Sequence, residues 1–159
     1  MTRQDSGIKV VARNRKASHD YHLGDTYQAG IALQGSEIKS IRANRVSLQE
    51  GYVEERGGEL WLVGVHISPY EQASIFGHTD PLRPRKLLLH KREIAHIIDW
   101  IRERGHTAVP TMIYLERGRA KVEIAMAKGK KLYDKRDSIG KREAQRQIHR
   151  ALKSDLREQ

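Results

Sequence analysis

The chain has 159 residues, no cysteine and a net charge of +10, and 38% of its residues are hydrophobic. The lack of cysteine excludes disulfides and thiolate metal sites. No uncharged apolar run approaches the roughly 18 residues of a membrane span, and no apolar signal segment opens the chain, so we expect no membrane contact and a cytoplasmic location. Residues 128–159 hold eleven Lys or Arg and five Asp or Glu, an asymmetry typical of proteins that bind a polyanion.

Strands dominate the expectations for the first half of the chain. In order, we expect a disordered lead (1–7), a strand (8–12), a polar segment (14–24) and a β-rich segment (26–35). Ile38 and Ile41 then lie at helical spacing after a serine that can cap a helix, which predicts a short amphipathic helix within 35–45. Two alternating runs in 47–70 flank Gly57-Gly58, which predicts a β-hairpin.

The second half alternates between loop, helix and hairpin. Residues 71–85 have the composition of a long loop. The stretch 90–104 carries four isoleucines at the i, i+3, i+4 and i+7 positions of a helix, and Gly105 is expected to stop that helix. A second hairpin is predicted over 110–129, with its turn near Arg117-Gly118. Short strands in meander order indicate a mainly β protein, an antiparallel sheet curled into a closed or nearly closed barrel, with two or three helices inserted.

The last 25 residues are polar but periodic. On a helical wheel, one arc of about 80° collects only cationic side chains, namely Arg142, Arg146, Arg150, Lys153 and Arg157. The opposite stripe is thin, so we expect residues 133–159 to be disordered when free and helical against an anionic surface. A permanently docked C-terminal helix is the alternative.

The chain shows no catalytic constellation. It lacks a phosphate-cradling G-x-x-x-x-G-K-[ST] loop and a G-x-S-x-G elbow. His19 and His22 lie three residues apart around Asp20, which is a weak metal signal without a third ligand and leaves a metal-dependent nuclease as a remote alternative. We therefore predict a protein that is not an enzyme and has no cofactor.

Three basic segments favour RNA as the polyanion. They are NRKASHDYH (14–22), PRKLLLHKRE (84–93) and KGKKLYDKR (128–136). Cations can contact phosphates, while Tyr and His rings offer flat faces to unstacked bases. The leucines of the second segment are most simply core residues, and its cations can also be a solvated rim.

Several motifs, in order along almost the whole chain, resemble the small protein B (SsrA-binding protein) family. They are NRKASHDY, YQAGIALQGSEIKSIRA, GYVEERGGELWLVGVHISPYEQ, RPRKLLLHKREI and KVEIAMAKGKKLYDKR. The resemblance implies a six-stranded antiparallel barrel of OB-like topology over 8–132, with about three short helices and a basic tail. It implies binding of the tRNA-like part of transfer-messenger RNA and its delivery to stalled ribosomes in trans-translation. Elongation factor Tu and alanyl-tRNA synthetase act on the same RNA, and a monomer is expected.

The resemblance also implies which residues carry the function. The RNA-binding set is Asn14, Arg15, Lys16, His19, Tyr21, Gln28, Glu37, Lys39, Ser40, Arg42, Lys86, Leu88, Lys121, Lys128, Gly129, Lys130 and Lys131. The ribosome-binding tail adds Tyr133, Asp134, Lys135 and Arg136 to the five cations of the helical arc. Such a tail is expected to probe the empty mRNA channel and the decoding centre.

Two positions depart from the family pattern. Gln28 stands where many members have glutamate, so a hydrogen bond survives but a contact that needs the anion weakens. Tyr133 stands where some members have histidine, which leaves stacking as the shared ability of the two rings. A permanent ribosomal protein with an RNA-penetrating tail has the same composition and remains the alternative function, which stoichiometry on the ribosome separates from a delivery factor.

Overall fold

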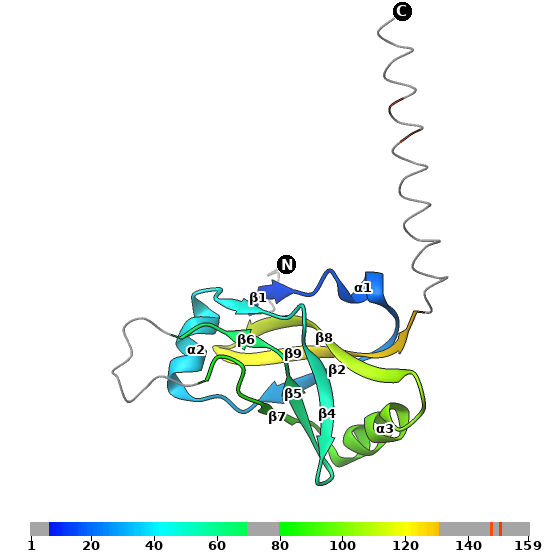
Figure 1. Ribbon diagram of the computed structural model, residues 1–159. Helices are drawn as coiled ribbons and strands as arrows, with labels where there is room; N and C mark the ends of the chain where they lie inside the picture. Colours follow the sequence, from blue (N-terminus) through cyan, green and yellow to red (C-terminus); the bar gives the residue numbers. More distant parts are fainter. Residues whose placement is uncertain (1–6, 70–79, 131–146, 148–149, 151–159) are drawn as a thin grey trace, which may run out of the picture.

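The computed structural model describes residues 7–69, 80–130, 147 and 150 (Figure 1). Its strands and helices are β1 (Ile8–Arg13), α1 (Ala17–Asp20), β2 (Tyr21–Ile31), α2 (Gly35–Arg42), β3 (Val46–Ser47), β4 (Tyr52–Arg56), β5 (Glu59–Val63), β6 (His66–Ile67), β7 (Arg85–Leu88), α3 (Lys91–Ile101), β8 (His106–Glu116) and β9 (Arg119–Gly129). The mainly β class with three helices, predicted from the sequence, is confirmed. None of the helices in the described residues is long and apolar enough to span a membrane.

One antiparallel sheet organises the described part of the chain. Seven strands follow the order β1-β8-β9-β2-β7-β5-β4, and β3 and β6 form a separate two-stranded ribbon. The two ends of the long sheet are not hydrogen-bonded to each other, but β4 comes back to contact β8, so the sheet is strongly curled (Figure 1). The resemblance implied six strands, whereas the described residues form nine. Two of the additional strands, β3 and β6, have two residues each and are too short to carry an alternation signal.

The core fills the inside of this curl. Strand alternation places Leu60 and Leu62 of β5 inside, both fully buried, and Val122 and Ile124 of β9 likewise. The helices contribute Ile41 from α2 and Ile97 from α3. The leucines of the second basic segment divide: Leu87 is fully buried, whereas Leu88 is 52% exposed, so the expectation of three core leucines was wrong for Leu88.

Both predicted hairpins are confirmed. The turn between β4 and β5 has φ values of 58° at Gly57 and 79° at Gly58. The turn between β8 and β9 has 50° at Arg117 and 78° at Gly118. Two successive positive φ values define the tight turn whose twist matches that of paired strands.

Several element bounds differ from the sequence predictions. The polar segment 14–24 contains α1 and the start of β2. A register shift between Leu23 and Thr26 interrupts the alternation of inward and outward side chains in β2, so the start of this strand is not visible in the sequence. Strand β8 begins at His106 rather than at residue 110, because a second register shift beside Pro110 accommodates the proline within the strand. Helix α3 ends at Ile101, four residues before the expected stop at Gly105.

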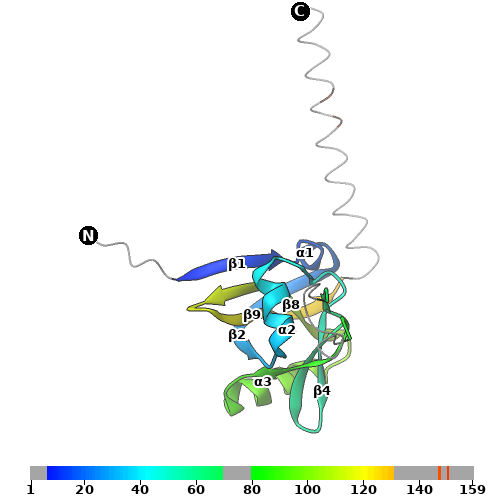
Figure 2. The same cartoon turned by 90° about the vertical axis from the view of Figure 1, so that its left-hand side faces the viewer.

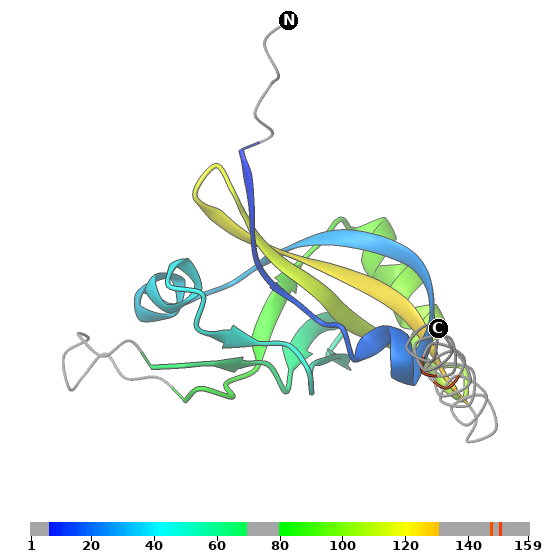
Figure 3. The same ribbon diagram turned by 90° about the horizontal axis from the view of Figure 1, so that it is seen from above.

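Helix α2 begins with a different cap from the one predicted. Its N-cap is Gln34 rather than a serine, and the backbone N–H of Gln34 donates to Oε1 of Glu37 at 2.9 Å. The carboxylate of Glu37 thereby satisfies a backbone donor at the start of the helix. Helices α1 and α2 lie at opposite ends of the sheet (Figures 1 and 3).

Candidate nucleic-acid interface

The first and third basic segments meet at one end of the sheet. In the β2–β9 pairing, Tyr21 lies opposite Gly129 and His22 opposite Lys128. Lys130 donates its backbone N–H to the carbonyl of Asp20 at 3.1 Å and its Nζ to the carbonyl of Ser18 at 3.1 Å. The structure therefore brings to this end of the sheet a set that we call the α1 patch: Arg15, Lys16, His19, Tyr21, Lys128, Gly129 and Lys130. Within it, Lys128 shares the face of its partner His22 and not that of Tyr21.

The α1 patch combines solvent-facing cations with one half-buried ring. Arg15 and Lys128 are exposed. Lys16 pairs with Glu50 at 3.1 Å, and this hydrogen bond raises the pKa of Lys16. Tyr21 packs against a small buried cluster yet remains partly accessible, so part of its ring is available for stacking.

Asn14 supports the α1 patch from inside. Its side chain is 8% exposed and donates to the carbonyls of Leu48 at 3.2 Å and Pro110 at 3.0 Å. Its Oδ1 accepts the backbone N–H of Ala17 at 3.2 Å, which secures the start of α1. With its amide used in this way, Asn14 holds the loop in place rather than facing an RNA.

Four other predicted residues share the outer face of neighbouring strands. Gly30 of β2 pairs with Lys121 of β9 on one side and with Leu88 of β7 on the other. Alternation places Gln28 on the same face as Gly30, and Lys86 on the same face as Leu88. We call Gln28, Lys86, Leu88 and Lys121 the strand face. Both lysines of the strand face pair with carboxylates of neighbouring strands. Nζ of Lys121 lies 3.0 Å from Oε2 of Glu116, and Nζ of Lys86 lies 3.8 Å from Oε2 of Glu59.

Tyr114 is a residue of this face that sequence reasoning missed. It is 4% exposed, and its hydroxyl donates to Oε1 of Gln28 at 2.5 Å. Burial raises the pKa of Tyr114, so the phenol stays protonated. Tyr114 pairs with Lys121 across β8 and β9, and only knowledge of that register could have shown its proximity to Gln28.

The α2 cations extend the strand face toward the β8–β9 turn. Lys39 and Arg42 are exposed on α2, and Arg42 donates to the carbonyl of Gly118 at 3.5 Å. The turn itself brings two further exposed cations, Arg117 and Arg119, which the sequence analysis did not single out. Figure 2 shows α2 in front of β2, β8 and β9.

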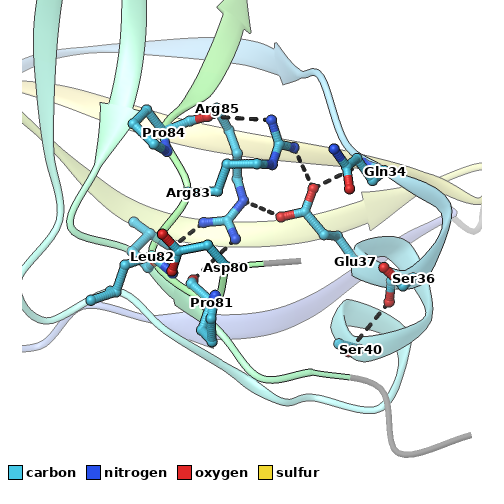
Figure 4. Close-up of polar contacts among 11 residues, drawn as sticks. Gln34, Ser36, Glu37, Ser40, Asp80, Pro81, Leu82, Arg83, Pro84 and Arg85 are labelled. Carbon is cyan, nitrogen blue, oxygen red and sulfur yellow. Dashed lines mark hydrogen bonds and ion pairs between the residues drawn. The ribbon is translucent and has the colours of Figure 1, made fainter. Parts of the chain in front are cut away.

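Glu37 and Ser40 lie beneath α2 and not on its surface. Glu37 is 2% exposed and Ser40 is fully buried, with its Oγ 3.3 Å from the carbonyl of Ser36. One Glu37 oxygen pairs with Arg83 and the other with Arg85 (Figure 4). We therefore assign Glu37 and Ser40 to the support of the interface, because neither can reach an RNA from inside the fold.

The arginine partners complete a buried ionic network. Arg85 is fully buried and also donates to the carbonyls of Val65 at 2.9 Å and Pro81 at 3.1 Å. Burial alone would raise the pKa of Glu37, but the N–H of Gln34 and the two guanidinium groups outweigh it and lower that pKa. The network ties α2 to the strand β7 and to the segment that precedes it.

The remaining predicted residues fall mostly outside the described part of the chain. These are Lys131, Tyr133, Asp134, Lys135, Arg136, Arg142, Arg146, Lys153 and Arg157. Arg150 is described and is helical and exposed. Among the described residues, no group of three or more His, Asp or Glu side chains is placed to hold a metal ion.

The fold is a curled β-sheet, and cationic and aromatic side chains lie at one of its ends and on an outer strand face. These features are those of a small β protein with a surface suited to RNA. The family model of SmpB protein matches residues 11–154, and the chain belongs to this family. It is 57% identical to the SsrA-binding protein of Roseiflexus sp. (strain RS-1) over 157 residues, which is 99% of each chain. The SsrA-binding protein of Acetivibrio thermocellus is 54% identical over 149 residues, covering 94% of this chain and 96% of the relative.

A solved structure is also similar. It is described as "tmRNA-SmpB: a journey to the center of the bacterial ribosome". The TM-score is 0.65 at 46% sequence identity, and the alignment covers 77% of this chain and 85% of the other.

Proposed function

We propose that this protein binds the tRNA-like part of transfer-messenger RNA and carries it to stalled ribosomes, without catalysing a reaction itself. The observation that carries the proposal is the α1 patch, where Lys130 bonds to the carbonyls of Ser18 and Asp20 and so lies beside a basic segment that precedes it by more than 100 residues. The SsrA-binding proteins to which the chain is similar over almost its full length support the choice of RNA. Elongation factor Tu and alanyl-tRNA synthetase act on that same RNA.

The described surface supports an extended RNA contact. The α1 patch and the α2 cations lie at opposite ends of the sheet, and the strand face lies next to α2. Phosphate contacts at several places position an RNA, while rings and apolar side chains such as Tyr21 and Leu88 meet unpaired bases. A structured RNA with both a backbone and exposed loop bases fits this surface better than a uniform duplex.

The tail has a separate role in the proposal. Residues 133–159 bind the ribosome, with Lys135 and Arg136 on ribosomal RNA near the decoding centre and the arc from Arg142 to Arg157 along the empty mRNA channel. A cationic segment that folds on binding can occupy the channel only when no message is present. Vacant and occupied ribosomes would thus be distinguished by steric exclusion.

Purification of the full chain from its own host at moderate salt, followed by sequencing of the RNA that accompanies it, tests the first part. One dominant small RNA with a tRNA-like end is expected. Ribosomal RNA alone, in equal proportion to the protein, would refute the proposal in favour of a permanent ribosomal protein.

A truncation and a double substitution test the second part. Removal of residues 134–159 is expected to leave binding of the tRNA-like fragment nearly intact and to abolish tagging of nascent peptides. Changing Lys135 and Arg136 together to alanine is expected to do the same. Loss of fragment affinity in proportion to the charge removed would show that barrel and tail are not separate binding surfaces.

A further inference from the structure

Strand β1 leaves part of one edge unpaired. It stands at the end of the seven-stranded sheet, and no strand of the described residues other than β8 pairs with it (Figure 2). Its second half is covered, because Val11 and Ala12 pack against the core. Its first half is not covered, since Ile8 is 46% exposed and Val10 is 38% exposed. We call residues 8–10 the free edge.

The register of β1 on β8 shows which backbone groups point away from the sheet. The backbone N–H of Arg117 donates to the carbonyl of Gly7 at 3.3 Å, so these two residues form a hydrogen-bonded pair just before β1 begins. Bonded and non-bonded pairs alternate along an antiparallel ladder, so the pairs that contain Ile8 and Val10 are non-bonded ones. The N–H and C=O groups of Ile8 and Val10 therefore point outward and are available to a further strand.

The charge around the free edge is positive. Lys9 is exposed, and among the ion pairs of the described residues none includes Lys9. Arg117 is also exposed and lies beside Gly7, where an added Cβ would be 3.8 Å from the Cγ of Arg117. The carboxylate of Glu116, which follows next on β8, is already paired with Lys121 at 3.0 Å. A strand added at this edge is therefore favoured when it is acidic.

The same charge opposes pairing with a second copy of the chain. The antiparallel register that uses both outward-pointing residues places Ile8 of one copy opposite Val10 of the other. It also places the two Lys9 side chains directly opposite each other, where like charges destabilise a sheet. A lysine in this position is a common protection of edge strands against self-association.

We propose that the free edge binds an extended acidic segment of a second protein as an added antiparallel strand. The backbone of that segment bonds to Ile8 and Val10, a carboxylate lies opposite Lys9, and apolar side chains on either side of the carboxylate cover Ile8 and Val10. A strand fits better than a nucleic acid, because the edge offers donors and acceptors together, whereas a phosphate only accepts. No residue of the free edge belongs to the α1 patch, the strand face or the tail, so the inference does not depend on the proposed function.

A short peptide with blocked ends, Thr-Val-Glu-Val-Thr, is the probe. It is added to the isotope-labelled full chain, and we expect saturable shifts of the backbone amide signals of Ile8, Lys9 and Val10 in NMR spectra at millimolar peptide. In the added strand both valines bond to β1, whereas the N–H of the glutamate points away. Methylation of the two valine nitrogens should therefore abolish the shifts, and methylation of the glutamate nitrogen, the matched control, should preserve them. Equal behaviour of the two methylated peptides, or no saturable shift with the unmodified one, would overturn the inference.

A charge reversal at Lys9 tests the chemistry of the partner. Lys9→Glu should weaken binding of the acidic peptide several-fold and should strengthen binding of the same peptide with lysine in place of glutamate. Arg56→Glu makes the same change in net charge at the exposed end of β4 and should alter neither affinity. Equal effects of the two substitutions would show that the net charge of the chain attracts the peptide, and the inference would be wrong.

Two other occupants of the free edge give different results. If the signals of Ile8 and Val10 moved with protein concentration alone, the edge would pair with a second copy of the chain. If the tRNA-like fragment displaced the peptide, the edge would belong to the RNA-binding surface. Either result would overturn the inference. A fragment that bound nowhere on the chain would instead refute the proposed function and leave the peptide result unchanged.

Discussion

Glu37 is the predicted RNA-binding residue for which experiment can best distinguish support of the fold from direct contact with RNA. It is 2% exposed, and its carboxylate is shared by Arg83, by the fully buried Arg85 and by the backbone N–H of Gln34. Glu37→Gln keeps the size of the side chain but removes the charge, which leaves the Arg85 guanidinium buried without an anion. Breaking a buried pair in this way costs about 3–5 kcal/mol.

The lower end of that range is expected here. Arg85 keeps the carbonyls of Val65 and Pro81 as acceptors, and Arg83 is partly accessible to water. We therefore expect Glu37→Gln to lower the free energy of unfolding by about 3 kcal/mol at pH 7. Urea unfolding followed by the fluorescence of Trp61 and Trp100 measures it. Glu50→Gln, which removes an exposed carboxylate, is the control and should change little.

The effect has a defined pH dependence. The folded-state pKa of Glu37 is lowered from its ordinary value of 4.5, so its contribution to stability is fully present above that value and is lost as the pH falls through the lower, folded-state pKa. The difference between the unsubstituted protein and Glu37→Gln should thus be constant from pH 6 to 8 and shrink in strong acid. A difference that grew on acidification would contradict the ionic assignment.

A measurement of RNA affinity decides whether Glu37 supports the fold or contacts the RNA. At a temperature where Glu37→Gln is fully folded, we expect its affinity for the tRNA-like fragment to stay close to that of the unsubstituted protein. Unchanged stability with a tenfold loss of affinity would refute the reasoning and return Glu37 to the RNA-contacting residues.

Three further predictions concern the interface. Tyr21→Ala should cost about 1–3 kcal/mol of RNA affinity if its ring stacks on a base, and Tyr21→Phe should cost little; equal losses in both would point to the hydroxyl instead. Asn14→Ala should lower the free energy of unfolding by about 1–3 kcal/mol, since the carbonyls of Leu48 and Pro110 lose their donor. A variant of unchanged stability with weakened RNA binding would show instead that Asn14 contacts the RNA. Tyr114→Phe frees the Gln28 amide, so we expect a changed side-chain amide signal of Gln28 in NMR spectra and several-fold weaker RNA binding; an unchanged signal would show that the two side chains do not interact in solution.

Local patterns were sufficient for the parts of the fold that depend on neighbours in sequence. The two hairpins follow from Gly57-Gly58 and from Arg117-Gly118, because the positive φ angles of these turns depend only on the turn residues themselves. The stripe of isoleucines was enough to place α3. The start of β2 was not predictable, because its register shift breaks the alternation on which strand recognition depends.

The site was predictable in composition but not in arrangement. Arg15, Lys16 and Lys128 have a basic context that is visible in sequence, but only β2–β9 pairing brings Lys128 to the end of the sheet at which β2 begins. The family resemblance could not show which of its residues face outward, because burial depends on packing. Glu37 is buried by two arginines that follow it by more than forty residues, and no local pattern marks that pairing.

Strand β9 has a mechanical consequence for a protein whose C-terminal segment follows it directly. It is eleven residues long and is flanked by β8 on one side and β2 on the other, both antiparallel. Hydrogen bonds in such pairs run perpendicular to the strands. A force on Gly129 that is directed along β9 therefore loads the hydrogen bonds to β8 and to β2 in shear, so these bonds resist it together. Under such a force, β9 can leave the sheet only when many hydrogen bonds break at once.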